Sequence, residues 1–153
     1  MDARDIMTRD VVAVSPDVPI GEAVDVLMYY QIHGVPVVDG GRQLIGMISF
    51  TDLASGRGKR VRDIMASDPV YASEDTPVEE IAAAMLDQTV RRVSIIEGGR
   101  VLGIVSASDI VRVFLQRTPA RATAARPRKL AASRGIRHAR VCVRRRGVDA
   151  MPR

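Results

Sequence analysis

The sequence predicts an α/β fold of the α+β type, in which two tandem β-α-β-β-α repeats pack together as a pseudo-two-fold pair. Three observations support this fold class. The chain repeats itself at a nearly constant offset, each copy combines a helical apolar pattern with short apolar runs, and 46% of the 153 residues are hydrophobic. One copy of about 57 residues would bury too little surface to be stable alone, so we expect the two copies to pack face to face.

The internal repeat relates residues 4–53 to residues 62–110. Both copies open with Arg-Asp-Ile-Met, and they align at an offset of 58 that falls to 57 after Leu44. Seventeen of 50 aligned positions are identical, whereas chance would give about three at ordinary composition. The body of the protein is therefore predicted to be a tandem duplication.

Each copy is expected to contain the same elements in the same order. Apolar residues at helical spacing predict the longer helices, and Gly-Gly turns separate the two strands of each hairpin. In the second copy, the sequence Thr76-Pro77-Val78-Glu79 is typical of a capping box with proline at the first helical position. The predicted strands are 11–14, 35–38, 44–48, 93–96 and 101–105. The predicted helices are 20–31, a helix that begins near residues 50–52, a helix whose buried stripe runs over 78–86, and 107–116.

The net charge of +5 is unevenly distributed along the chain. Residues 1–117 carry 12 basic and 17 acidic side chains, whereas residues 118–153 carry 11 basic and one acidic. This asymmetry predicts a body with a basic, Arg/Ala-rich, disordered tail. The expected parts are repeat 1 at 1–55, a flexible linker at 56–61, repeat 2 at 62–117 and the tail at 118–153.

The tail admits three interpretations. It is a solvated extension, an artefact of the gene model, or an arm that seeks anions. In the last case the partner is nucleic acid, an acidic protein or an anionic lipid surface, bound weakly and in a salt-dependent way.

Composition excludes several classes of protein. No apolar run approaches about 18 residues and the charged N-terminus shows no secretory signal, so we expect a cytoplasmic protein with no transmembrane segment. The single cysteine, Cys142, and the two histidines, His33 and His138, predict neither a disulfide framework nor a metal site. No nucleophile and base stand in an arrangement typical of catalysis, so we do not expect an enzyme or catalytic residues.

The closing motifs of the two copies carry a family resemblance. Residues 46–52 (GMISFTD) and 103–109 (GIVSASD) each follow a hairpin strand, VPVV at 35–38 and VSII at 93–96. With the two RDIM openings, they resemble the CBS-domain pair, also called a Bateman module, over residues 4–113. The resemblance implies a regulatory module that requires no cofactor and binds an adenine nucleotide, such as AMP, ADP or ATP, in the cleft between the repeats. It also implies a homodimer and a separate effector protein that the sequence does not name.

The closing motifs also supply the strongest candidate ligand residues. A helix start presents unpaired N–H groups and a positive dipole end, hydroxyls add donors, and a carboxylate can accept both ribose hydroxyls. The same Ser-x-x-Asp spacing also fits helix capping, and the sequence leaves both roles open. By this reasoning and by resemblance, the residues predicted to contact ribose and phosphate are Ser49, Thr51, Asp52, Ser106, Ser108 and Asp109.

Weaker candidates precede the middle strand of each copy. Family members that bind phosphate often have His-Arg there, and the matching positions hold His33-Gly34 and Arg91-Arg92. We therefore expect unequal sites, the one on the Arg91-Arg92 side being better for polyphosphate, although solvated surface side chains are the alternative. The apolar residues expected to hold the base, or simply to form the core, are Val12, Val35, Val37, Val70, Val93 and Ile95.

Two other functions stay open at this point. The repeats could form a ligand-free module for self-association or docking, in which serine and aspartate only cap helices, or the tail could bind nucleic acid. The residues also do not select among AMP, ADP, ATP, S-adenosylmethionine, NAD and a cyclic dinucleotide.

Overall fold

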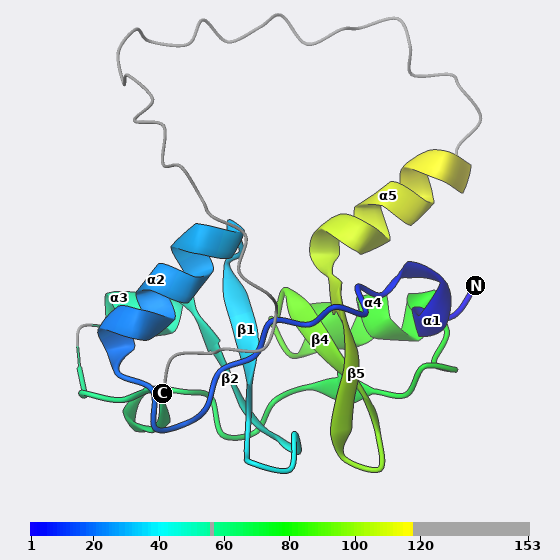
Figure 1. Ribbon diagram of the computed structural model, residues 1–153. Helices are drawn as coiled ribbons and strands as arrows, with labels where there is room; N and C mark the ends of the chain where they lie inside the picture. Colours follow the sequence, from blue (N-terminus) through cyan, green and yellow to red (C-terminus); the bar gives the residue numbers. More distant parts are fainter. Residues whose placement is uncertain (56, 118–153) are drawn as a thin grey trace, which may run out of the picture. The chain divides into compact units, whose positions relative to one another are not determined.

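The computed structural model describes residues 1–55 and 57–117, so the predictions for the tail at 118–153 fall outside the described residues. The mixed α+β fold class is confirmed (Figure 1). The first repeat contains α1 (Ala3–Ile6), α2 (Ile20–Tyr30), β1 (Gly34–Val38), β2 (Leu44–Ser49) and α3 (Phe50–Ala54). The second contains a 3-10 turn (Val61–Asp63), β3 (Tyr71–Ala72), α4 (Val78–Asp87), β4 (Arg92–Glu97), β5 (Arg100–Ser106) and α5 (Ala107–Arg117).

The two hairpins pair as predicted, β1 with β2 and β4 with β5, both antiparallel, and β3 adds to β4 in parallel. The prediction of a strand at 11–14 is wrong, because this segment keeps only an isolated bridge at Val14. The cause is Pro36 in the middle of β1, whose nitrogen has no hydrogen to donate. At the matching place in β4, the N–H of Ser94 donates to the carbonyl of Val70 at 3.2 Å, and a short parallel strand forms.

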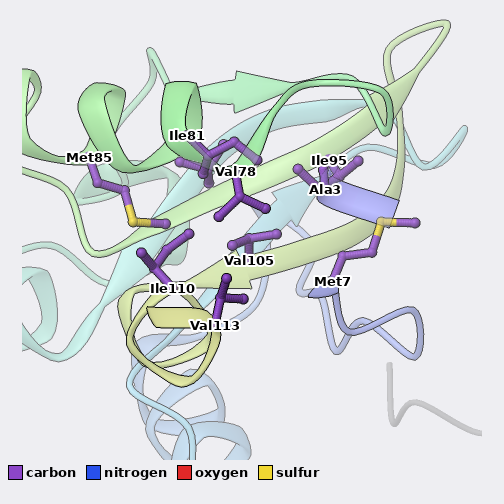
Figure 2. Close-up of a cluster of buried hydrophobic side chains, with 10 residues drawn as sticks. Ala3, Met7, Val78, Ile81, Met85, Ile95, Val105, Ile110 and Val113 are labelled. Atoms are coloured by element: carbon purple, nitrogen blue, oxygen red, sulfur yellow. The ribbon is translucent and has the colours of Figure 1, made fainter. Parts of the chain in front are cut away.

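The opening segments are exchanged between the repeats. Ala3 and Met7 from the first opening lie in the core of the second repeat (Figure 2), among side chains of α4, β4, β5 and α5. Val61 from the second opening is fully buried in the core of the first repeat, beside Leu27 of α2 and Ile48 of β2. Each core therefore depends on a segment of the other repeat, and residues 1–117 form one compact unit.

Matching contacts on the two sides show the pseudo-two-fold relation. Thr8 bridges Ile104 of β5, and the equivalent Ala66 bridges Met47 of β2. Both bridges are antiparallel and join the end of an opening segment to the closing motif of the other repeat. The ion pairs repeat the same relation, with Arg4 bound to Asp75 and Arg62 bound to Asp17.

Two local predictions differ from the structure. The end of the predicted linker is tied to the first repeat, because the N–H of Ile20 donates to the carbonyl of Lys59 at 3.1 Å. The predicted capping box is wrong, since α4 begins at Val78 and the hydroxyl of Thr76 instead accepts the N–H of Ser73 at 3.1 Å. Pro77 occupies the cap position in an extended conformation, so Thr76 stands one residue too early to cap the helix.

Candidate ligand-binding site

A cavity of about 400 Å³ lies where the two repeats meet. Its volume is in the range of pockets that hold small ligands. The first repeat contributes the segment after α1 and the turn between α2 and β1, and the second contributes β4, β5 and the start of α5. The lining residues are Thr8, Asp10, Val11, Val12, Gln31, Ile32, His33 and Gly34 from the first repeat, and Arg92, Ile104, Ser106, Ser108, Asp109 and Arg112 from the second.

The carboxylate of Asp109 is held in a defined orientation at the start of α5. Its Oδ2 accepts the N–H of Ser106 at 2.9 Å and the hydroxyl of Ser106 at 2.6 Å, while Oδ1 accepts a hydrogen bond from Arg112 at 3.1 Å. The side chain of Asp109 is only 15% exposed. Because a carboxylate oxygen can accept two hydrogen bonds, Oδ1 keeps capacity for one hydroxyl of a ligand.

The equivalent pair in the first repeat has the same geometry. Both the N–H and the hydroxyl of Ser49 donate to Oδ2 of Asp52, each at 2.7 Å. The capping role that the sequence left open is therefore confirmed for both Ser-x-x-Asp motifs. The ligand role of these residues stays a prediction.

Arg92 at the start of β4 brings a half-buried cation to the cavity. Burial lowers the pKa of the Arg92 guanidinium, and the adjacent charge of Arg91 lowers it further. Arg92 forms no side-chain hydrogen bond or ion pair with any residue of the described ranges. A cation that is partly removed from water and left without a carboxylate is a natural contact for an anionic ligand.

The structure brings some of the predicted site residues together. The predicted residues that line this cavity are Val12, His33, Arg92, Ser106, Ser108 and Asp109. His33 and Arg92, which we assigned to separate sites, thus meet in one cavity.

The other predicted residues do not line this cavity. Ser49, Thr51 and Asp52 lie at the junction of β2 and α3, and Arg91 is exposed. Val70 packs against the second core from a half-buried position. The remaining apolar candidates are buried core residues, namely Val35, Val37, Val93 and Ile95.

Sequence reasoning missed several lining residues, and two of them carried a usable signal. Arg112 follows Asp109 by three residues in α5, a spacing at which helical side chains meet. Ile104 is an apolar position inside the closing motif itself. The others come from turns whose path depends on tertiary packing, and they are Thr8, Asp10, Val11, Gln31 and Ile32.

Comparison with known proteins identifies the family. The model of the CBS domain matches residues 3–57 and again residues 61–116. The chain belongs to the CBS-domain family. Inosine-5'-monophosphate dehydrogenase of Methanocaldococcus jannaschii, a curated relative, is 37% identical over 113 residues, which make up 72% of this chain but only 23% of that enzyme. The similarity to this relative therefore concerns less than a quarter of its length.

Solved structures of CBS-domain pairs have the same fold. The CBS domain pair of protein MJ0100, solved in complex with 5'-methylthioadenosine and S-adenosyl-L-methionine, has a TM-score of 0.75 and 29% identity, covering 77% of this chain and 98% of that chain. CBSX2 of Arabidopsis thaliana, solved in complex with AMP, has a TM-score of 0.70 and 27% identity, covering 75% of this chain and 96% of that chain. The ligands of both proteins contain an adenosine group.

The described part of the chain contains neither a membrane-spanning helix nor a metal-binding cluster. Over residues 1–55 and 57–117, no helix is long and apolar enough to cross a membrane. In the same ranges, no cluster of three or more His, Cys, Asp or Glu side chains is arranged to hold a metal ion.

Proposed function

We propose that this CBS-domain pair is a regulatory module that binds an adenine nucleotide in the cavity between its repeats. The observation that carries the proposal is that one cavity is lined both by an oriented carboxylate, Asp109, and by a cation, Arg92, that has no ion-pair partner among the described residues. Adenosine-containing ligands bound to similar CBS pairs support the same ligand class.

Each part of a nucleotide finds suitable chemistry in the cavity. Asp109 Oδ1 can accept a ribose hydroxyl, and the hydroxyl of Ser108 can donate to an oxygen of the ligand. Apolar side chains offer a surface for the flat base, and backbone groups beside them can bond to its edge. These side chains are Val11, Val12, Ile32 and Ile104.

Regulation follows because the ligand would touch both repeats. A ligand that binds one packing of the repeats better than another shifts the population toward the first. We propose that a separate effector protein reads this shift, or a change in the association of two copies, in the cytoplasm. The module itself performs no catalysis in this proposal, since the similarity to the enzyme relative covers only a small part of that enzyme.

A ligand-free association module is the second candidate. The observation that favours it is the engagement of both Ser-Asp pairs as helix caps, which gives these residues a structural role without any ligand. In that case the repeats would serve only for self-association or docking.

Thermal unfolding of the purified, ligand-free chain distinguishes these candidates. AMP, ATP, 5'-methylthioadenosine and S-adenosylmethionine are added separately at millimolar concentration, with UMP as the control that changes the base alone. A tenfold excess over Kd stabilises the native state by about 1.4 kcal/mol, so we expect the midpoint to rise with at least one adenine ligand and to rise less with UMP. Unchanged midpoints with every adenine ligand would contradict the proposal and favour the ligand-free module.

A further inference from the structure

We propose that Arg112 is a positioning residue that restricts the Asp109 carboxylate to one ribose hydroxyl, so that the cavity requires one of the two hydroxyls and tolerates the loss of the other. The inference rests on the proposed function and specifies how the sugar of the ligand is recognised. It departs from the expectation, drawn from the sequence, that the carboxylate accepts both hydroxyls.

The protein already occupies most of the acceptor positions of Asp109. A carboxylate has about four such positions, two on each oxygen. Both positions of Oδ2 are occupied, because the N–H of Ser106 donates to it at 2.9 Å and the hydroxyl of Ser106 at 2.6 Å. Oδ1 accepts Nη1 of Arg112 at 3.1 Å. One acceptor position therefore remains for a ligand, on the same oxygen that holds the arginine.

The position of Arg112 is set by α5. Arg112 follows Asp109 by three residues, the spacing at which side chains of a helix meet. Ile110 and Val113 of the same helix are buried in the core of the second repeat (Figure 2), which fixes the rotation of the helix about its axis. Both members of the ion pair line the cavity, Arg112 being 74% exposed and Asp109 15% exposed. A ligand in the cavity therefore meets the carboxylate together with its arginine.

A second hydroxyl would have to displace Arg112 from Oδ1. This exchange replaces a charged donor with a neutral one, and hydrogen bonds between two charged groups are the stronger kind. Although a mostly exposed arginine holds the carboxylate only modestly, the second hydroxyl gains no more than the difference between the two bonds. We expect this difference to change the Kd by no more than about threefold.

The equivalent carboxylate of the first repeat has no such arginine. Ser55 stands at the position that corresponds to Arg112. Among the described residues, only Ser49 donates side-chain or backbone hydrogen bonds to the carboxylate of Asp52, and both reach Oδ2. The restriction at Asp109 thus comes from Arg112 and not from the Ser-x-x-Asp motif that the two repeats share.

Titration calorimetry of the full chain with AMP, 2'-deoxy-AMP and 3'-deoxy-AMP tests the inference, because the three probes have the same base and the same phosphate. We expect one deoxy probe to bind at least about tenfold more weakly than AMP, since it lacks the hydroxyl that is bonded to a charged carboxylate. We expect the other deoxy probe to bind within about threefold of AMP.

Two substitutions of Arg112 test its role. Arg112→Met removes the donor and frees a second position on Oδ1, so the probe that the wild type tolerates should bind this variant at least about tenfold more weakly than AMP does. Arg112→Lys keeps a cation that can donate to Oδ1, and it should retain the wild-type ratios. Each ratio compares ligands with the same phosphate, so an effect of the lost charge on phosphate binding cancels.

A matched control is Arg117→Met, which makes the same change at the other end of α5. There Arg117 donates to Glu79 at 2.6 Å, and neither residue lines the cavity. This variant should leave both ratios unchanged, because it alters the charge of the helix without touching Asp109.

Several results would overturn the inference and leave the proposed function intact, because AMP still binds in each of them. They are a loss of at least tenfold with both deoxy probes in the wild-type chain, a loss with neither, and unchanged ratios in folded Arg112→Met. No binding of AMP would overturn the proposed function and this inference together.

Discussion

The sulfur of Met7, in the opening of the first repeat, lies against the backbone of Gly103 in β5 of the second repeat. A Cβ on Gly103 would be 2.5 Å from Sδ and 2.9 Å from Cγ of Met7. The equivalent contact joins Met65 to Gly46 in β2, where a Cβ would lie 2.8 Å from the sulfur and 2.9 Å from the carbonyl oxygen of Ala66. The glycine of each closing motif thus makes room for the methionine of the exchanged opening.

This contact predicts that Gly103→Ala and Gly46→Ala each destabilise the protein. We expect the free energy of unfolding to fall by about 1–3 kcal/mol, because the added methyl group overpacks the junction between the repeats. Urea denaturation measures the change. Gly21→Ala in α2 is the control, since nothing lies within 4 Å of the added Cβ, and it should raise the free energy by about 0.5–1 kcal/mol. Equal effects at positions 21 and 103 would contradict the packing argument.

Substituting each capping carboxylate in turn should distinguish its effect on stability from its effect on ligand binding. Asp52→Ala and Asp109→Ala each delete the same hydrogen bonds from serine, so each should lower the free energy of unfolding by about 1 kcal/mol. Asp109 lines the cavity between the repeats. We therefore expect Asp109→Ala to weaken AMP at least about tenfold and Asp52→Ala to leave the Kd within about threefold.

Calorimetry on the two folded variants gives this comparison directly. If both variants bind AMP as the wild type does, the carboxylates act only as caps. If Asp52→Ala alone loses AMP, the assignment of the ligand to the Asp109 cavity is wrong.

Acid should destabilise the protein partly through Asp63. The backbone N–H groups of Arg60 and Lys59 donate to its carboxylate at 2.9 Å and 2.7 Å, and they lower the pKa of Asp63 below the ordinary 3.8. Because the folded pKa is the lower one, this stabilisation is present above about pH 4 and is lost as the pH falls through the folded pKa. Asp63→Asn should therefore flatten the fall in the free energy of unfolding below about pH 4. Parallel pH curves for the variant and the wild type would contradict this.

The hydroxyl of Ser94 is fully buried and has no hydrogen-bond partner within the described part of the chain. Ser94→Ala should therefore leave the free energy of unfolding unchanged or raise it by up to about 1 kcal/mol. Ser94→Pro should lower it, because the N–H that donates to Val70 is lost from the middle of a sheet. A marked loss of stability in Ser94→Ala alone would show that the hydroxyl has a partner.

The fold was predictable from the sequence to the extent that local patterns decide it. The apolar spacing of α2 and α4 and the Gly-Gly turns placed the helices and hairpins close to their observed bounds. The exchange of the openings was not predictable, because both openings have the same sequence, RDIM, and nothing in it indicates which repeat each opening packs against. The absence of the predicted strand at 11–14 could have been anticipated from Pro36 in β1, because proline cannot donate a hydrogen bond to a neighbouring strand.

The candidate site was predictable in part for the same reason. The motif at 103–109 supplied Ser106, Ser108 and Asp109, all of which line the cavity. The presence of His33 and Arg92 in the same cavity was not predictable, since it results from the packing of one repeat on the other. Gly34 was noted only as a departure from the family's pattern, whereas the structure shows that it leaves space for Arg92.

The central claim is that the cavity between the repeats binds an adenine nucleotide, and a crystal structure of the chain grown with saturating AMP tests it most directly. We predict AMP in the cavity, with its phosphate within hydrogen-bond distance of the Arg92 guanidinium and a ribose hydroxyl on Oδ1 of Asp109. An empty cavity at saturating AMP, or AMP bound outside the residues that line it, would contradict the claim.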